Sequence, residues 1–164
     1  MTKEQTPPIR KTVTVPLDPL AAFELFAKDI DRWWPKETHS LAAGSGKGAQ
    51  ARVRVEPRPG GRVIETLPDG TEAPWADVEH YIPGTRLTLR WYVGQTPEQA
   101  TLVDVRFSPV DTGTRVDLSH SGFETLGAAG SKTHASYHTG WDRVLVKCFA
   151  DACTNTTAAA PVHC

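Results

Sequence analysis

Residues 83–91 of the chain, PGTRLTLRW, are the stretch that decides the fold. The Pro-Gly pair is a turn signal, and the residues after it alternate strictly between polar and apolar side chains. The polar members are Arg86, Thr88 and Arg90, and the apolar members are Leu87, Leu89 and Trp91. This period indicates a β-strand with one buried face, so we expect an antiparallel sheet with water on its other side.

The same pattern recurs on both sides of this segment. We predict strands over residues 9–15, 51–56, 62–67, 72–82, 85–92, 100–107 and 114–120. Short segments rich in Pro, Gly and Asp separate most of them. Short turns can join only antiparallel neighbours, so the sheet is predicted to be mainly an antiparallel meander.

Two helical regions complete the predicted fold. Asp18 is a suitable N-cap with Pro19 at the first helical position, and the apolar residues that follow predict two short helices ending near residues 33–35. A long helix is predicted from Ser131 to about Cys153. The sequence therefore predicts an α+β fold of six to seven curved strands around a long C-terminal helix, with a cavity between them. We expect one domain over residues 1–153 and a disordered tail over 154–164.

Composition restricts the possible partners. The 164 residues carry 18 Lys and Arg against 19 Asp and Glu, a formal net charge of −1. Nucleic acid is therefore not expected as a partner, because no global positive field exists. No apolar run is long enough to insert into a membrane, and residues 1–10 are polar, which predicts a cytoplasmic protein. The three cysteines are expected to be free thiols in a reducing compartment.

Alternation also predicts which side chains face the cavity. Three inward positions are polar: Glu65, His80 and His120. Such groups either satisfy a nearby carbonyl or water, or anchor a ligand in an apolar cavity, and both interpretations stay open. Aromatic residues are expected to supply the walls. The predicted ligand-binding set is Glu65, His80, Trp91, Phe107, His120, Tyr137 and Trp141.

Motifs for other chemistry are incomplete. Residues 44–48, GSGKG, lack the first glycine and the Ser or Thr of a phosphate-binding loop, so we expect a flexible loop over the cavity mouth. His134 and His138 are four apart on the predicted helix, but the sequence shows no clear third ligand, so no metal site is predicted. No nucleophile motif occurs. We therefore expect no cofactor and no catalytic residue.

Several of these segments resemble one known superfamily. They are Trp33-Trp34-Pro35, residues 60–65 (GGRVIE), 75–78 (WADV), 83–91, 114–123 (TRVDLSHSGF) and Gly140-Trp141. Together they resemble the START-like, or SRPBCC, superfamily, in the branch named after the activator of the ninety-kilodalton heat-shock protein ATPase. The resemblance covers about residues 9–153 and implies a helix-grip fold. The opening and the spacing to the last helix are also similar to the calicheamicin self-resistance protein and related enediyne-resistance proteins.

The resemblance implies a fold more than a function, because the superfamily includes lipid carriers, cyclases, hydrolases and binding proteins. We expect non-catalytic binding of a small hydrophobic or aromatic molecule by a monomer or weak homodimer. Three alternatives stay open: sequestration of an enediyne-type natural product, co-chaperone activity with a chaperone partner in the stress response, and a cyclase or hydrolase. The enzyme would use Glu65 or His120 as its acid or base.

Overall fold

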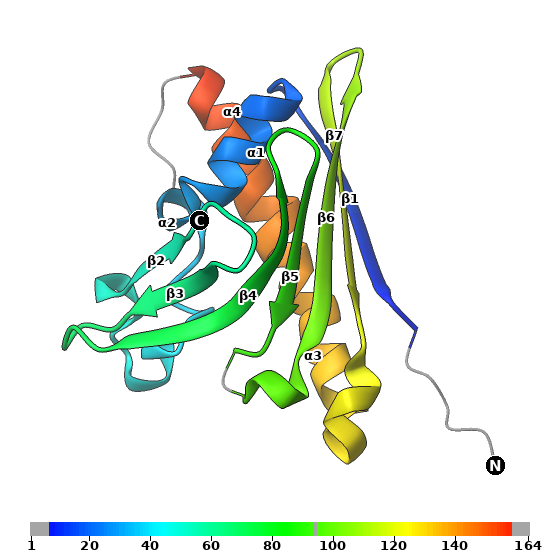
Figure 1. The fold of residues 1–164 in the computed structure, drawn as a ribbon. Helices are drawn as coiled ribbons and strands as arrows, with labels where there is room; N and C mark the ends of the chain where they lie inside the picture. The colour runs from blue at the N-terminus through cyan, green and yellow to red at the C-terminus, as the bar shows by residue number, and fades with distance from the viewer. Residues whose placement is uncertain (1–6, 94, 159–164) are drawn as a thin grey trace.

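The computed structural model describes residues 7–93 and 95–158. Within these residues the chain forms seven strands, two short helices, several 3-10 turns and a long C-terminal helical run (Figure 1). The strands are β1 (Ile9–Val15), β2 (Arg52–Val55), β3 (Arg62–Thr66), β4 (Glu72–Ile82), β5 (Arg86–Trp91), β6 (Thr101–Val110) and β7 (Gly113–Ser121). The helices before the meander are α1 (Pro19–Ala27) and α2 (Ile30–Trp33), with short 3-10 turns η1 (Ala42–Ser45) and η2 (Gly48–Gln50). Later come η3 (Pro97–Gln99), η4 (Phe123–Ala129), α3 (Gly130–Trp141), the π-helical segment η5 (Asp142–Phe149) and α4 (Ala150–Ala158).

All the strands belong to one antiparallel sheet. Its order is β1-β7-β6-β5-β4-β3-β2, so the first strand of the chain lies beside the last. Figure 1 shows the sheet curling around the run of α3, η5 and α4. This arrangement confirms the predicted α+β helix-grip fold.

The first helix begins and packs as its sequence predicts. The Asp18 carboxylate accepts a hydrogen bond from the backbone N–H of Ala21 at 2.7 Å, and Pro19 occupies the first turn. Phe23 and Phe26 are buried, and their rings lie 5.2 and 6.0 Å from that of Phe107. Phe107 therefore belongs to the core between α1 and β6.

A β-bulge corrects one predicted face. The register between β4 and β5 shifts between Val78 and His80, so that Glu79 is an additional residue on β4. As a result Tyr81 faces inward and packs against Phe23 at 5.0 Å, whereas His80 and Ile82 are exposed. The predicted inward orientation of His80 is wrong, because strict alternation does not continue through a bulge.

The C-terminal helical run is longer than predicted. It continues to Ala158, so residues 154–158 of the expected disordered tail are helical. The sequence has no Gly or Pro between Cys153 and Pro161 that would end a helix. Residues 159–164 of the predicted tail lie outside the described residues. Within the described ranges, no helix is both long and apolar enough to cross a membrane.

The cysteines also differ from expectation. Cys153 is a free, buried thiol, and its burial raises its pKa to about 12. Cys148 is disulfide-bonded, so the prediction of free thiols is wrong for this residue. Cys164 lies outside the described residues.

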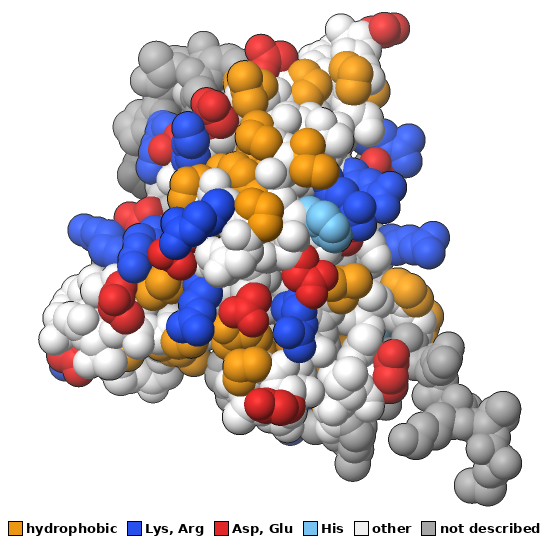
Figure 2. Space-filling model, viewed as in Figure 1, with side chains coloured by type: hydrophobic (Ala, Val, Ile, Leu, Met, Phe, Trp, Pro, Cys, Tyr) orange, Lys and Arg blue, Asp and Glu red, His pale blue; other side chains and the backbone are white. Residues whose placement is uncertain are grey.

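The outer face of the sheet is polar, as alternation predicts. Asp104 is a centre of charge pairing: it pairs with Arg86 at 2.8 Å and with Arg106 at 3.0 Å. Arg90 is exposed and lies 3.7 Å from Glu79. Figure 2 shows basic and acidic side chains interspersed on this view of the molecule. These ion pairs are solvent-exposed to differing degrees and contribute little stability each.

Candidate ligand-binding cavity

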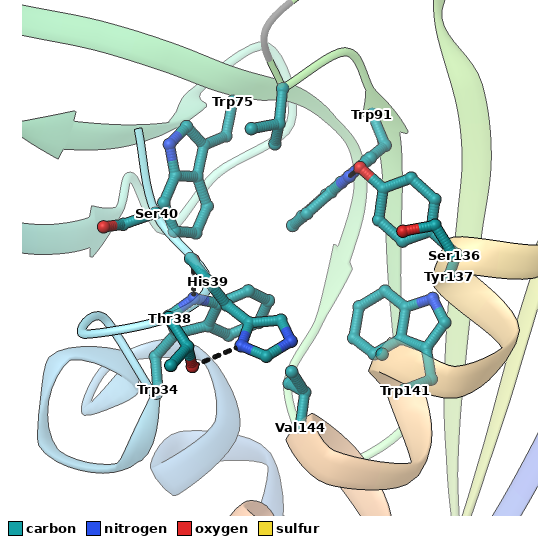
Figure 3. Close-up of a pocket in the computed structure, with 12 residues that line it drawn as sticks. Trp34, Thr38, His39, Ser40, Trp75, Trp91, Ser136, Tyr137, Trp141 and Val144 are labelled. Atoms are coloured by element: carbon teal, nitrogen blue, oxygen red, sulfur yellow. Dashed lines mark hydrogen bonds between the residues drawn. The ribbon is translucent and has the colours of Figure 1, made fainter. Parts of the chain in front are cut away.

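A cavity of about 240 Å³ lies between the sheet, the loop after α2 and helix α3 (Figure 3). Its lining combines aromatic residues with a few hydroxyl groups and one imidazole. The lining residues are Trp34, Thr38, His39, Ser40, Trp75, Trp91, Val93, Ser136, Tyr137, Gly140, Trp141 and Val144. The cavity therefore occupies the space between sheet and helix in which the sequence predicts a ligand.

Four indoles form a contiguous cluster at this cavity, called the indole ring below because its contacts close on themselves. The centroid of Trp34 lies 5.2 Å from that of Trp75 and 6.1 Å from that of Trp141. Trp91 lies 5.9 Å from both Trp75 and Trp141 and 6.0 Å from Trp34, so it contacts all three other indoles. Tyr137 is stacked on Trp141 at 6.4 Å with an interplanar angle of 28°. The result is a continuous aromatic surface contributed by the loop after α2, two strands and α3.

Each indole N–H of this ring is bonded within the protein. Trp34 Nε1 donates to the backbone carbonyl of His39 at 2.6 Å, and Trp91 Nε1 donates to the Tyr137 hydroxyl oxygen at 2.9 Å. Trp75 and Trp141 donate to the two buried residues described next. These bonds fix the ring orientations, so the indoles present π-faces and C–H edges to a ligand.

Glu65 lies next to the indole ring but outside the cavity lining, and its carboxylate holds neighbouring groups in place. It is fully buried, and its Oε1 accepts from Trp75 Nε1 at 2.9 Å. The same carboxylate accepts from the backbone N–H groups of Leu41 at 2.8 Å and Ala42 at 3.0 Å. The side chain thus anchors residues 41–42 to β3. The segment predicted to be a flexible loop forms η1 and η2, and the side chain of Ala42 is buried.

His120 lies behind the opposite side of the ring and is also fully buried. Trp141 Nε1 can only donate, so the 3.0 Å bond makes His120 Nδ1 the acceptor. His120 Nε2–H then donates to Thr101 Oγ1 at 2.7 Å, and that hydroxyl donates to the Trp91 carbonyl at 3.2 Å. Burial lowers the pKa of His120 to about 3, with a smaller effect from His134. His120 is therefore neutral, and its two hydrogen bonds connect Trp141 on α3, through the Thr101 hydroxyl, to the backbone of Trp91 on β5.

The polar groups that reach the cavity come from the loop after α2 and from α3. His39 is half-buried; burial first, and the positive charge of Arg143 second, lower the pKa of its imidazole. Burial raises the pKa of the Tyr137 phenol, so the hydroxyl stays protonated at neutral pH. Thr38, His39 and Tyr137 all surround the hollow in Figure 3. At neutral pH the cavity thus offers a neutral imidazole and a phenolic O–H.

The structure separates the predicted site residues into groups. Trp91, Tyr137 and Trp141 line the cavity. Glu65 and His120 each bond an indole of the ring from behind. The other two predicted residues are placed elsewhere: Phe107 lies in the core and His80 at the exposed surface.

Sequence reasoning missed nine of the twelve lining residues, and Trp34, Trp75 and His39 are the three with the largest side chains among them. Trp34 and Trp75 lie in segments that resemble the superfamily, but no sequence pattern places their side chains at the cavity. His39 lies in an irregular loop, where neither a period of two nor a helical period assigns a face. The Trp-Trp-Pro segment is the one local signal that points to this loop.

Metal-ligating side chains do not gather in the described part of the chain. No group of three or more His, Cys, Asp or Glu residues is close enough there to hold an ion. His134 Nε2 lies 2.9 Å from the Pro7 carbonyl oxygen, which occupies one of its ring nitrogens.

Comparisons with known proteins agree with this architecture. The family model described as Activator of Hsp90 ATPase homolog 1-like protein matches residues 23–152. No curated protein matches the sequence. A solved structure of an anthrahydroquino-γ-pyrone synthase is similar with 30% identity and a TM-score of 0.57, covering 84% of this chain and 90% of that one.

Two other similar structures are more distant in sequence. DynU16, a protein from the dynemicin biosynthetic locus, has 18% identity and a TM-score of 0.63, and the match covers 94% of this chain but 48% of that one. Protein MLL2253 from Mesorhizobium loti has 15% identity and a TM-score of 0.63, covering 87% of this chain and 94% of that one. At these identities the likeness supports the fold alone.

Proposed function

The chain belongs to the Activator of Hsp90 ATPase homolog 1-like protein family, and from this premise we propose that it binds a small planar aromatic molecule in the tryptophan-lined cavity. The observation that carries the proposal is the cluster of four contacting indoles along the cavity, with Tyr137 stacked on one of them. Aromatic surfaces pair with flat π-systems in offset and edge-to-face geometries, which add about 0.5–1.5 kcal/mol per pair beyond burial.

Size and charge narrow the ligand class. The cavity of about 240 Å³ is slightly below the ~300–1,000 Å³ of typical small-molecule sites, which favours a ligand of a few fused rings. Aromatic cages can also bind cations. Among the described residues, no Asp or Glu lines the cavity, and the positive charge of Arg143 acts on His39 at the cavity wall. A neutral or anionic aromatic molecule therefore fits better than a cation.

The proposal can be tested with alizarin, a planar dihydroxyanthraquinone. Four of the five tryptophans line the cavity, so saturable binding should quench most of the intrinsic fluorescence, and calorimetry should give the same affinity. Benzyltrimethylammonium and decanoic acid serve as cationic and aliphatic probes of comparable size. Alizarin should bind at least tenfold more tightly than either. Absence of saturable alizarin binding, or tighter binding of the cation, would overturn the proposal.

A matched pair of variants locates the site. A Cβ on Gly140 would lie 3.8 Å from His39 Nε2, an ordinary contact, so a longer side chain there extends into the hollow. Gly140→Leu should therefore weaken alizarin at least tenfold. Ala135→Leu adds the same side chain at an exposed position of α3 outside the lining and should leave affinity unchanged. Equal binding by both variants would place the ligand elsewhere.

One observation favours a second function in the same cavity. The relative with 30% identity is an anthrahydroquino-γ-pyrone synthase, and the match extends over most of both chains. A cavity that binds a planar aromatic molecule could close an oxygen-containing ring on it rather than release it unchanged. The sequence predicts binding of such a molecule without catalysis. Ring closure would also require a proton acceptor and a proton donor next to the bound ligand.

A further inference from the structure

The hydrogen bonds around His39 determine which of its nitrogens faces the cavity. Its Nδ1 lies 2.7 Å from Thr38 Oγ1, and that hydroxyl donates its own hydrogen to the Pro35 carbonyl at 3.4 Å. In the tautomer with the proton on Nδ1, the Thr38 hydroxyl accepts from Nδ1–H while it donates to the Pro35 carbonyl, and Nε2 carries the free lone pair. The Gly140 contact at 3.8 Å places Nε2 on the cavity side, as Figure 3 also shows.

The backbone of His39 is held as firmly as its ring. The carbonyl of His39 accepts the 2.6 Å bond from Trp34 Nε1, so the imidazole is positioned by a wall residue of the same cavity. Because its pKa is lowered, the imidazole is neutral near pH 7 and its Nε2 lone pair is free to accept a proton.

Tyr137 supplies the complementary group. Its hydroxyl oxygen accepts from Trp91 Nε1 at 2.9 Å, and an indole N–H cannot accept in return. The phenolic hydrogen therefore remains available for a ligand. Figure 3 shows Tyr137 and His39 on opposite sides of the hollow, from α3 and from the loop after α2.

We infer that His39 Nε2 and the Tyr137 hydroxyl act as a proton acceptor and a proton donor that close a pyranone ring on an ortho-hydroxyaryl ketone bound in the tryptophan-lined cavity. The inference rests on the proposed function, because the indole ring must first bind the planar substrate. It names two catalytic residues and a substrate class: a fused aromatic phenol carrying a neighbouring α,β-alkynyl ketone.

The opposed placement of the two groups suits this chemistry. In a free ortho-hydroxyaryl ketone the hydroxyl is bonded to the neighbouring carbonyl oxygen, and this arrangement keeps the unsaturated chain away from the hydroxyl. Ring closure requires the carbonyl to rotate to the far side. An acceptor for the hydroxyl on one wall and a donor for the carbonyl on the other stabilise the rotated, reactive form.

The step balances without a cofactor. His39 Nε2 takes the phenolic proton while the phenol oxygen forms a bond to the β-carbon of the unsaturated ketone. The displaced π-electron pair moves through the α-carbon to the carbonyl oxygen, which takes the proton of the Tyr137 hydroxyl. The O–H proton of the resulting allenol then moves to the α-carbon, which restores the ketone inside the new ring, and the proton held by His39 returns to the Tyr137 oxygen. Substrate and product are isomers, so no oxidant or reductant is consumed.

The experiment uses the full chain and an ortho-hydroxyaryl phenylethynyl ketone, which closes to flavone with a change in absorbance. The wild-type protein should accelerate closure over buffer, and His39→Asn and Tyr137→Phe should each lower kcat about 100-fold or more, in the range of general acid–base effects. His138→Gln, at an exposed position of α3 outside the lining, should leave kcat unchanged.

Alizarin binding distinguishes a failure of the proposed binding function from a failure of the proposed acid–base pair. His39→Asn leaves the four indoles and their N–H bonds in place, so it should retain alizarin affinity within about threefold while kcat falls. Tyr137→Phe keeps the stacked ring but removes the acceptor of Trp91 Nε1, so its kcat is measured at saturating substrate, where a change in affinity does not contribute. Loss of alizarin binding in the wild type would refute the proposed function itself. Normal alizarin binding without faster ring closure, or full activity in His39→Asn, would refute the acid–base pair and leave the binding function standing.

Discussion

Removing the imidazole of His120 should change how the stability of the protein depends on pH. In the folded state Nδ1 accepts from Trp141 and Nε2–H donates to Thr101, so the site holds a neutral imidazole in one tautomer. Protonation would place a second N–H against the Trp141 donor in a fully buried site. This agrees with a folded pKa of about 3, against about 6.5 for an exposed histidine.

The sign follows from proton linkage. The folded pKa lies below the unfolded value, so between the two the unfolded chain binds more protons. The contribution of His120 is fully present above about pH 6.5 and is lost as the pH falls toward 3. Within that window, each pH unit should cost roughly 1 kcal/mol of unfolding free energy from this one group.

Urea denaturation at pH 7, 6 and 5 measures the effect. Carboxylates and other histidines also titrate there, so the informative quantity is the difference between wild type and His120→Gln. The variant should lose stability at pH 7, because Gln cannot satisfy Thr101 and Trp141 equally well, but its decline from pH 6 to pH 5 should be shallower by roughly 1 kcal/mol.

A second measurement covers the case in which the variant does not fold. The imidazole resonances of wild-type His120 should stay those of one neutral tautomer from pH 7 to pH 5 in an NMR titration. Titration of His120 near pH 6 in the folded protein, or parallel pH profiles of wild type and variant, would refute the reasoning.

Three further substitutions test the supports of the cavity. Glu65→Gln replaces a carboxylate that accepts backbone N–H bonds by an amide and should lower the unfolding free energy by roughly 1.5–3 kcal/mol. Amide exchange at residues 41–42 should also become faster, and unchanged exchange there would contradict the anchoring role of Glu65. Gly48→Ala places a Cβ 2.0 Å from the Lys36 carbonyl oxygen and should destabilise strongly in thermal melts, whereas Gly44→Ala, with nothing within 4 Å, should melt like wild type. Asp31→Ala leaves the Val53 N–H without its 2.9 Å acceptor and should cost about 1–3 kcal/mol in chemical denaturation; Asp31→Asn keeps an oxygen and should cost less.

The strands were the most predictable part of the molecule. The predicted segments 9–15 and 72–82 coincide with β1 and β4 to the residue. Polar and apolar residues that alternate between turns rich in Pro, Gly and Asp locate such strands from the local sequence alone. It fails at the bulge in β4, because the sequence Glu79-His80-Tyr81-Ile82 gives an amphipathic strand with either Tyr81 or the His80–Ile82 pair facing inward.

The candidate site was predictable only in part, for a physical reason. Trp91 and Trp141 lie on regular elements whose period assigns a face, and both line the cavity. His39 is brought there by an irregular loop, which the buried Glu65 carboxylate and the Trp34 indole hold in place. These are tertiary bonds between residues up to 24 positions apart in the sequence, and no local pattern encodes them.

The order of the sheet has a consequence for how the chain is made. β1 is synthesised first, yet its partner in the sheet is β7, which begins at Gly113. A nascent chain on the ribosome therefore carries β1 unpaired through the synthesis of the whole meander. Pairing partners so distant along the chain raise contact order and slow folding. Ribosome-bound chains stopped before residue 113 should leave β1 open to protease, and chains stopped after β7 has emerged should protect it.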